Sequence, residues 1–140
     1  MSKVINILMV EDDPLDVMDI RRTLDKMKIV YHLHHARNGE EGLRLLGQLA
    51  GEEPSVQPDI ALIDINMPKM NGLEFLQALR ADERWKGLRC FIITTSDEPF
   101  DRQSAKALGV SGYIVKPFKV NNPSSMDSFN LMIDLMNMRG

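Results

Sequence analysis

Three carboxylates stand where two apolar segments of this sequence end. Glu11 and Asp12 follow the apolar run at 4–10, and Asp64 ends the run at 59–64. Carboxylates that lie together repel one another unless a cation neutralises them. A small set of oxygen ligands that leaves room for water suits Mg²⁺. If the fold brings these side chains together, the sequence predicts a magnesium site.

Two further polar residues end apolar runs of the same kind. Thr94 lies near the end of 89–95, and Lys116 ends 111–116. A lysine is a flexible point charge that suits a phosphoryl oxygen, and a hydroxyl can donate a hydrogen bond to another. Together with a metal ion, these groups fit the charge that develops on a transferred phosphoryl group. Asp64 is then the candidate nucleophile, because carboxylates form aspartyl-phosphates in phosphoryl transfer.

The elements that must position these residues alternate between two patterns. Apolar residues recur at helical spacing between short strand-like runs, as at Leu73, Leu76 and Leu79. Alternating strands and helices predict a doubly wound α/β fold with a parallel sheet covered on both faces. Ligands of such sheets bind outside the carboxyl ends of the strands, so the five polar residues should meet in one crevice. The strand-like runs are 4–10, 31–36, 59–64, 89–95 and 111–116.

Helix starts are marked by capping residues. Asp13 precedes Pro14, which indicates a helix cap more than a fourth metal ligand. Two asparagines each precede a glutamate by three residues, which is typical of a helix start, at Asn38 with Glu41 and Asn71 with Glu74. The segment 47–59 predicts a helix end followed by a surface loop. The polar segment 119–128 leads into a predicted last helix with an apolar side at Phe129, Met132, Ile133 and Met136.

Composition bounds the class of protein. The 140 residues predict one domain, 1–140, without a separate output domain. A net charge of -3 and a pI near 5.6 do not favour non-specific nucleic-acid binding. No apolar run approaches the roughly 18 residues of a membrane span, and no signal pattern follows Met1, so we expect a cytoplasmic protein. Cys90 is the single cysteine and fits a reducing compartment.

Four segments resemble the receiver domain of two-component response regulators. They are VEDD (10–13), DINMPKMNG (64–72), TTS (94–96) and GYIVKPF (112–118). The resemblance covers essentially the whole chain and implies a flavodoxin-like (βα)5 fold with strand order 2-1-3-4-5. The added length at 47–59 is similar to single-domain receivers, of the chemotaxis and phytochrome-regulator kind, that are paired with phytochrome-type histidine kinases.

The resemblance also implies roles for individual residues. Asp64 would be the phosphoacceptor, with Glu11 and Asp12 as the acidic metal pair for Mg²⁺ and the backbone carbonyl of Asn66 as a further ligand. Lys116 would bind the phosphoryl group.

The same resemblance implies a switch. Thr94 would be the switch hydroxyl, and Tyr113 the aromatic residue whose rotamer changes with it. The bond from Lys116 to Pro117 would be cis, which an X-Pro amide tolerates.

The implied function is that of a signalling phosphoacceptor rather than an enzyme, since it would catalyse only its own phosphotransfer and dephosphorylation. It would take a phosphoryl group from a sensor histidine kinase and signal by conformational switching and binding to a downstream protein. A phosphorylation-dependent homodimer stays open. One alternative is a phosphorelay intermediate that passes the group to a histidine phosphotransfer protein. Another is a pseudo-receiver that binds partners without phosphorylation, against which the intact Asp12, Asp64, Thr94 and Lys116 speak.

Two further predictions concern the lifetime of the phosphoryl group and a possible second metal site. Thr95 is bulky beside the switch residue, and Asn66 and Ser96 offer no carboxylate to orient water, so we expect a phosphoryl lifetime of minutes or longer. His32, His34 and His35 fit ordinary strand residues better than a second metal site, because no cysteine or carboxylate accompanies them. The methionines fit core packing, with an adaptable contact surface as the alternative for a cluster at Met126, Met132, Met136 and Met138.

Overall fold

Strands and helices alternate in the computed structural model, which describes residues 4–116. The predicted last helix, the methionine cluster and the cis bond at Pro117 lie outside these residues. The elements are β1 (Ile5–Val10), α1 (Pro14–Lys26), β2 (Tyr31–Ala36), α2 (Gly39–Ala50), β3 (Ile60–Ile63), α3 (Gly72–Ala81), β4 (Cys90–Thr94), α4 (Pro99–Ala107) and β5 (Gly112–Val115).

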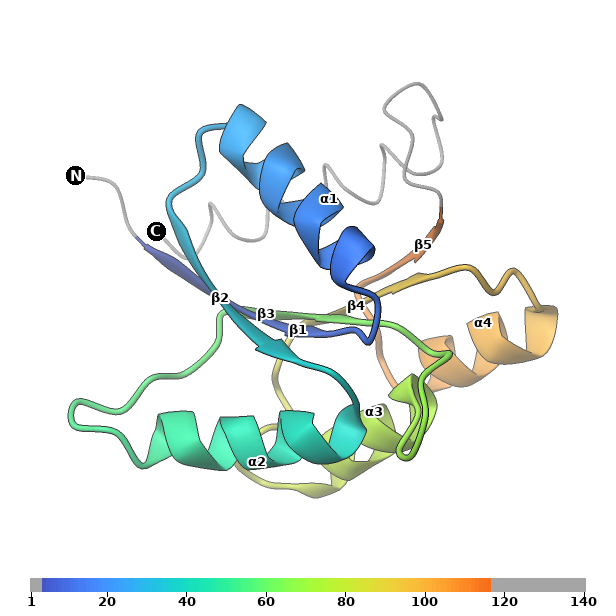
Figure 1. The fold of residues 1–140 in the computed structure, drawn as a ribbon. Coiled ribbons are helices and arrows are strands. Elements are labelled where there is room, and N and C mark those ends of the chain that lie inside the picture. Colours follow the sequence, from blue (N-terminus) through green and yellow to red (C-terminus); the bar gives the residue numbers. More distant parts are fainter. Residues whose placement is uncertain (1–3, 117–140) are drawn as a thin grey trace.

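The five strands form one parallel sheet in the order β2-β1-β3-β4-β5, as predicted. Figure 1 shows α1 on one face of this sheet and α2 and α3 on the other. The fold is therefore the doubly wound α/β arrangement, in which consecutive helices must cover both faces of a parallel sheet.

Side chains alternate between two core layers along each central strand. In β1, Leu8 and Val10 pack with residues of α2 and α3 in what we call the α2/α3 layer, which also includes Ala105 of α4. Ile7 and Met9 pack with the apolar side of α1 in what we call the α1 layer. The side chains of a strand alternate between its two faces. A residue directly after a strand is therefore expected on the same face as the residue two positions before it.

Helix starts agree with the capping predictions. The side chain of Asp13 accepts a hydrogen bond from the backbone N–H of Leu15 at 2.9 Å, which fixes the start of α1. Asn71 and Glu74 form a reciprocal capping box at α3. Asn38 caps α2, but Glu41 accepts from the N–H of Arg37 instead of completing the box.

The strand limits differ slightly from those predicted. β3 ends at Ile63 and β5 at Val115, so Asp64 and Lys116 are the first residues beyond their strands. The predicted loop follows the end of α2 at Ala50 and leads to β3. Among the helices between residues 4 and 116, none combines the length and apolar character needed to cross a membrane.

At the amino ends of β4 and β5, Arg80 of α3 links two connections. Its Nε donates to the carbonyl of Leu108 at 2.7 Å, and its Nη1 donates to those of Leu88 at 2.9 Å and Lys86 at 3.1 Å. Nη2 donates to the carbonyl of Gly109 at 3.3 Å. The guanidinium thus ties the segment before β4 to the turn before β5, and an open cleft of about 450 Å³ surrounds it.

Candidate functional site

The charged residues at the carboxyl end of the sheet gather on the face covered by α1. Glu11 is two residues beyond Met9, and Asp64 is two residues beyond Leu62, and both of these apolar residues belong to the α1 layer. Lys116 stands in the same relation to Ile114 of β5. The two-residue side-chain period of β1, β3 and β5 therefore delivers three charged side chains to one place.

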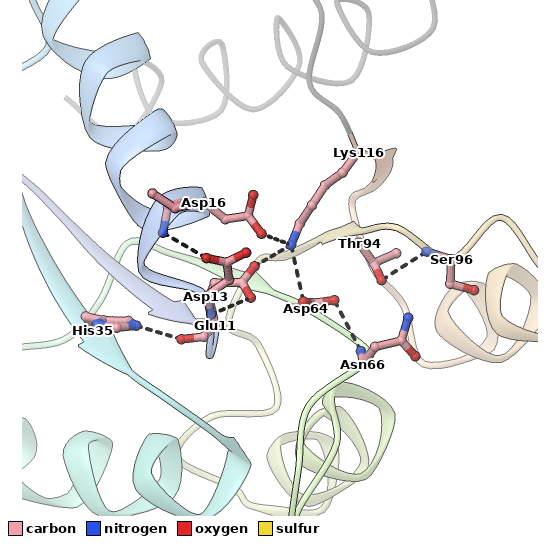
Figure 2. A network of polar contacts seen from close by, with 10 residues as sticks. Glu11, Asp13, Asp16, His35, Asp64, Asn66, Thr94, Ser96 and Lys116 are labelled. Carbon is pink, nitrogen blue, oxygen red and sulfur yellow. Dashed lines mark hydrogen bonds and ion pairs between the residues drawn. The ribbon is translucent and has the colours of Figure 1, made fainter.

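The ammonium of Lys116 lies at the centre of this group, as Figure 2 shows. Its Nζ lies 2.6 Å from Oε1 of Glu11, 2.6 Å from Oδ2 of Asp16 and 3.2 Å from Oδ2 of Asp64. An ammonium has three protons to donate. All three are directed at carboxylates, so the lysine is held by charge from β1, α1 and β3 together.

The carboxylates also lie close to one another. Ligand oxygens of Glu11, Asp12 and Asp64 all fall within 4.8 Å of each other. Glu11 is 1% exposed and Asp64 is 6% exposed, whereas Asp12 lies at the surface. The second oxygen of Asp64 accepts from the backbone N–H of Asn66 at 3.2 Å. These three residues are the predicted acidic metal group, and the structure brings them together.

Electrostatics in the cluster follow from burial and charge. Burial raises the pKa of the Glu11 carboxyl to about 8; the charge of Asp64 acts in the same direction, and Lys116 opposes it. Burial alone would lower the pKa of the Lys116 ammonium, but hydrogen bonds to Asp16 and Glu11 and the charge of Asp64 hold this pKa above its ordinary value. The carboxylates around Lys116 thus favour positive charge at this site.

An open cleft of about 440 Å³ gives access to these groups. Four of the five residues predicted to meet in one crevice line it, and Asn66 lines it as well. The full lining consists of Glu11, Asp12, Asp13, Pro14, Asp16, Asp64, Asn66, Thr95 and Lys116.

Thr94 is the predicted crevice residue that does not line this cleft. It is two residues beyond Ile92 of the α2/α3 layer, so the alternation places Thr94 on the α2/α3 side of the end of β4. Thr94 is fully buried, and its Oγ1 accepts from the N–H of Ser96 at 3.3 Å. Thr95, one residue later, lines the cleft instead.

Tyr113 lies on the same face as Thr94 and contacts the same loop. Its hydroxyl donates to the carbonyl of Ser96 at 3.0 Å, and the guanidinium of Arg102 lies 4.7 Å from the centre of its ring. The Ser96 hydroxyl donates to Asp101 of α4 at 2.6 Å. The two predicted switch residues, Thr94 and Tyr113, are therefore joined through one segment between β4 and α4.

Two residues of the site were not predicted from the sequence. Asp16 contacts Lys116 although the two are 100 residues apart, and only its place one turn after the cap Asp13 hinted at its position. Gly72 begins α3 against the phosphoacceptor candidate, because a Cβ at this position would lie 2.2 Å from the carbonyl oxygen of Asp64. The glycine allows the helix to approach the backbone of Asp64 closely.

His34 and His35 of β2 form hydrogen bonds to Asn6 of β1 and to Glu11. Nε2 of His34 lies 3.0 Å from Oδ1 of Asn6, and Nε2 of His35 lies 2.7 Å from the carbonyl oxygen of Glu11. Within the described residues, the group that could hold a metal is the one formed by Glu11, Asp12 and Asp64. His35 therefore supports the backbone at the site without entering it.

Comparisons with known proteins agree with this arrangement. The family model of the response regulator receiver domain matches residues 7–125. Protein PilH from Pseudomonas aeruginosa is 32% identical over 114 residues, which cover 79% of this chain and 84% of that protein. The chain spans about half the length of other curated relatives that it matches, 47% in one case.

Solved structures share the fold over nearly the full chain. A two-component response regulator from Legionella pneumophila matches with a TM-score of 0.77 and 29% identity, covering 96% of this chain and 99% of that one. The bacteriophytochrome response regulator AtBRR matches with a TM-score of 0.76 and 28% identity, covering 96% and 94%.

Proposed function

The chain belongs to the response regulator receiver domain family, and from this premise we propose that Asp64 accepts a phosphoryl group from a sensor histidine kinase. The observation that carries the proposal is the position of Nζ of Lys116, 3.2 Å from Oδ2 of Asp64 and beside the cluster of three carboxylates. Acceptance of a phosphoryl group is general in this family, and this chain keeps the residues that the chemistry needs.

The proposed transfer uses the side chains as they lie. A carboxylate oxygen of Asp64 attacks the phosphorus of a phosphohistidine and a P–O bond forms. The P–N bond breaks, its electron pair stays on the ring nitrogen, and the donor, which carries a proton on its other ring nitrogen, leaves as neutral imidazole. Lys116 donates to a phosphoryl oxygen, where it offsets the charge of the group. The backbone N–H of Asn66 holds the second carboxylate oxygen and fixes the orientation of the nucleophile.

Mg²⁺ is the proposed cofactor. The candidate ligands are carboxylate oxygens of Glu11, Asp12 and Asp64, with the carbonyl of Asn66 added, and an all-oxygen set with the surface-exposed Asp12 leaves room for water. This donor set fits the ion. Bound there, Mg²⁺ would offset the negative charge of the carboxylates and the phosphoryl group.

We propose that the signal leaves the site through the opposite face of the sheet. Phosphorylation adds a charge of about -1.5 to -2 beside the end of β4. Thr94 would move toward the phosphoryl group and release its contact with Ser96, whose carbonyl holds the Tyr113 hydroxyl. A change in the β4–α4 segment and in Tyr113 would then present an altered surface to a downstream protein.

The proposed kinase is of the phytochrome type, in the cytoplasm. Support comes from the similarity to a bacteriophytochrome response regulator.

We also propose that the phosphoryl group persists for minutes or longer. Thr95 and Asn66 line the cleft, and the Ser96 hydroxyl is engaged by Asp101. Loss of radiolabel from the phosphorylated protein measures this lifetime, and decay within seconds would exclude it.

Incubation with acetyl phosphate and Mg²⁺, followed by intact mass measurement, tests the phosphoacceptor. We expect one phosphate-sized increase in the wild type, none in Asp64→Asn, and the wild-type result in the control Asp19→Asn, a carboxylate exposed on α1. An undiminished increase in Asp64→Asn would disprove the assignment.

A further inference from the structure

We propose that Asp16 is a positioning residue that holds Lys116 throughout the phosphorylation cycle, a role that rests on the proposed function of Asp64. Asp16 lies in the first turn of α1, and its Oδ2 is 2.6 Å from Nζ of Lys116. Its side chain is 28% exposed, compared with 1% for Glu11 and 7% for Asp64.

Lys116 has only as many hydrogen-bond donors as its ammonium has protons. The ammonium has three protons, and three carboxylates lie within hydrogen-bond distance of Nζ. No proton is left for a phosphoryl oxygen. Lys116 must therefore exchange at least one partner when a phosphoryl group arrives at Asp64.

Two of the three partners belong to the chemistry itself. Asp64 becomes the phosphorylated side chain, and Glu11 is one of the three residues whose oxygens cluster within 4.8 Å as a metal group. A carboxylate that binds a cation holds a competing ammonium less tightly. Asp16 lies outside that group, so it is the partner that neither the phosphoryl group nor the metal takes away.

The backbone around Asp16 is suited to a fixed anchor. The cap of Asp13 and the proline at position 14 define where α1 begins, and Asp16 follows one turn later. Val17 and Ile20 bury the same helix against the sheet. A carboxylate on a packed helix restricts the long side chain of Lys116, which would otherwise lose rotamer freedom upon binding the phosphoryl group.

The consequence is a specific kinetic pattern. Without Asp16, Lys116 samples more positions, so the bound donor reacts more slowly although it still binds. We expect Asp16→Asn to lower the maximum rate of phosphorylation about tenfold and to change the half-saturating acetyl phosphate concentration by no more than about twofold. Asp16→Glu keeps the charge and should recover most of the rate.

The experiment measures phosphorylation rates by intact mass over a range of acetyl phosphate concentrations in saturating Mg²⁺. The wild type is compared with Asp16→Asn and Asp16→Glu. Asp19→Asn is the matched control, because it removes from the same helix an exposed carboxylate that lies 3.9 Å from Arg22. Urea unfolding checks that each variant is folded.

A second measurement observes Lys116 directly. NMR of the lysine ammonium groups should show a slowly exchanging signal from Lys116 in the wild type and in Asp19→Asn, and its loss in Asp16→Asn. Because it needs no phosphorylation, this measurement still tests the anchor if Asp64 proves not to accept a phosphoryl group.

The outcomes separate the two proposals. If the wild type gains no phosphate, the proposed function fails. If the wild type is phosphorylated and Asp16→Asn reaches the same or a higher maximum rate, the anchor is overturned. An effect confined to the half-saturating concentration, or a loss that Asp16→Glu does not reverse, overturns it as well.

Discussion

Lys116 and Arg80 are two cations at opposite ends of the strands of one sheet, and they are held in different ways. The Lys116 ammonium contacts three side-chain carboxylates. The Arg80 guanidinium donates to four backbone carbonyls in the connections that precede β4 and β5. Lys116 directs all three of its donors at partners and Arg80 four of its five, yet only the partners of Lys116 can be exchanged.

The difference separates a structural contact from a reactive one. A backbone carbonyl oxygen is held in place by the chain and is uncharged. It therefore does not become protonated or phosphorylated, and its hydrogen bond to Arg80 persists. A carboxylate can bind a metal ion, take up a proton or become phosphorylated, and each of these changes frees the cation beside it. The site at the carboxyl ends of the strands can therefore change state, whereas the contacts of Arg80 at the amino ends of β4 and β5 hold the connections in place.

The largest expected effect separates the two cations by reaction rate. Lys116→Met should slow phosphorylation by acetyl phosphate by a factor of about 100 to 1000, because a preorganised donor to the developing charge is lost. Arg80→Met should keep the wild-type rate per folded molecule, since Arg80 lies at the amino ends of the strands, away from the site. Time courses of intact mass measure both, and equal losses in the two variants would contradict the comparison.

Magnesium provides the next test. At a hundredfold excess over its dissociation constant, Mg²⁺ should raise the free energy of unfolding by about 2.7 kcal/mol. Arg80→Met should gain the same increment, and Asp12→Asn should gain less because a candidate ligand loses its charge. Urea unfolding with Mg²⁺ and after EDTA treatment measures the increments; an equal gain in Asp12→Asn would argue against the metal group.

Removing Arg80 should lower stability even though it leaves the chemistry intact. Four carbonyls lose a charged donor in Arg80→Met, and water can reach part of them through the cleft, so we expect a loss of about 2 kcal/mol. Urea unfolding measures the loss. Arg84→Met serves as the control, because the ion pair of Arg84 with Asp82 is exposed and its removal should change little.

The smallest expected effect concerns the reactivity of Cys90, which reports local opening of the structure around Arg80. Burial raises the pKa of this thiol to about 11, so near pH 8 it reacts with thiol reagents only when the structure opens. Its Sγ donates to the carbonyl of Leu88, which also accepts from Arg80. Arg80→Met should raise the rate of modification roughly tenfold through local opening. An unchanged rate of Cys90 modification would show that the structure around Cys90 opens as readily with Arg80 as without it.

Much of the fold could be predicted because local signals agreed with one another. The strand runs, the helical leucines and the caps at Asp13, Asn38 and Asn71 each indicated the same alternation of elements. The grouping of Glu11, Asp12, Asp64 and Lys116 followed from one rule about the carboxyl ends of parallel strands. That rule tells at which end of the strands a residue lies.

The same rule does not give the face, and this is why Thr94 was expected in the cleft that Thr95 lines. The face depends on the alternation within β4, which becomes certain only when its buried neighbours are assigned to layers. The contacts of Asp16 and of Arg80 were missed for another reason. Each joins segments distant in sequence, and no local pattern marks a side chain that reaches across the fold.

The close approach of α3 to Asp64 has a consequence for how this sequence can vary. Gly72 touches no phosphoryl group and has no side chain, yet any larger residue would press directly on the peptide that carries the nucleophile. In a mutational scan selected for phosphorylation, position 72 should tolerate substitution as poorly as position 64. Selection there would act on volume alone, which makes an inert residue as restricted in evolution as the reactive one it adjoins.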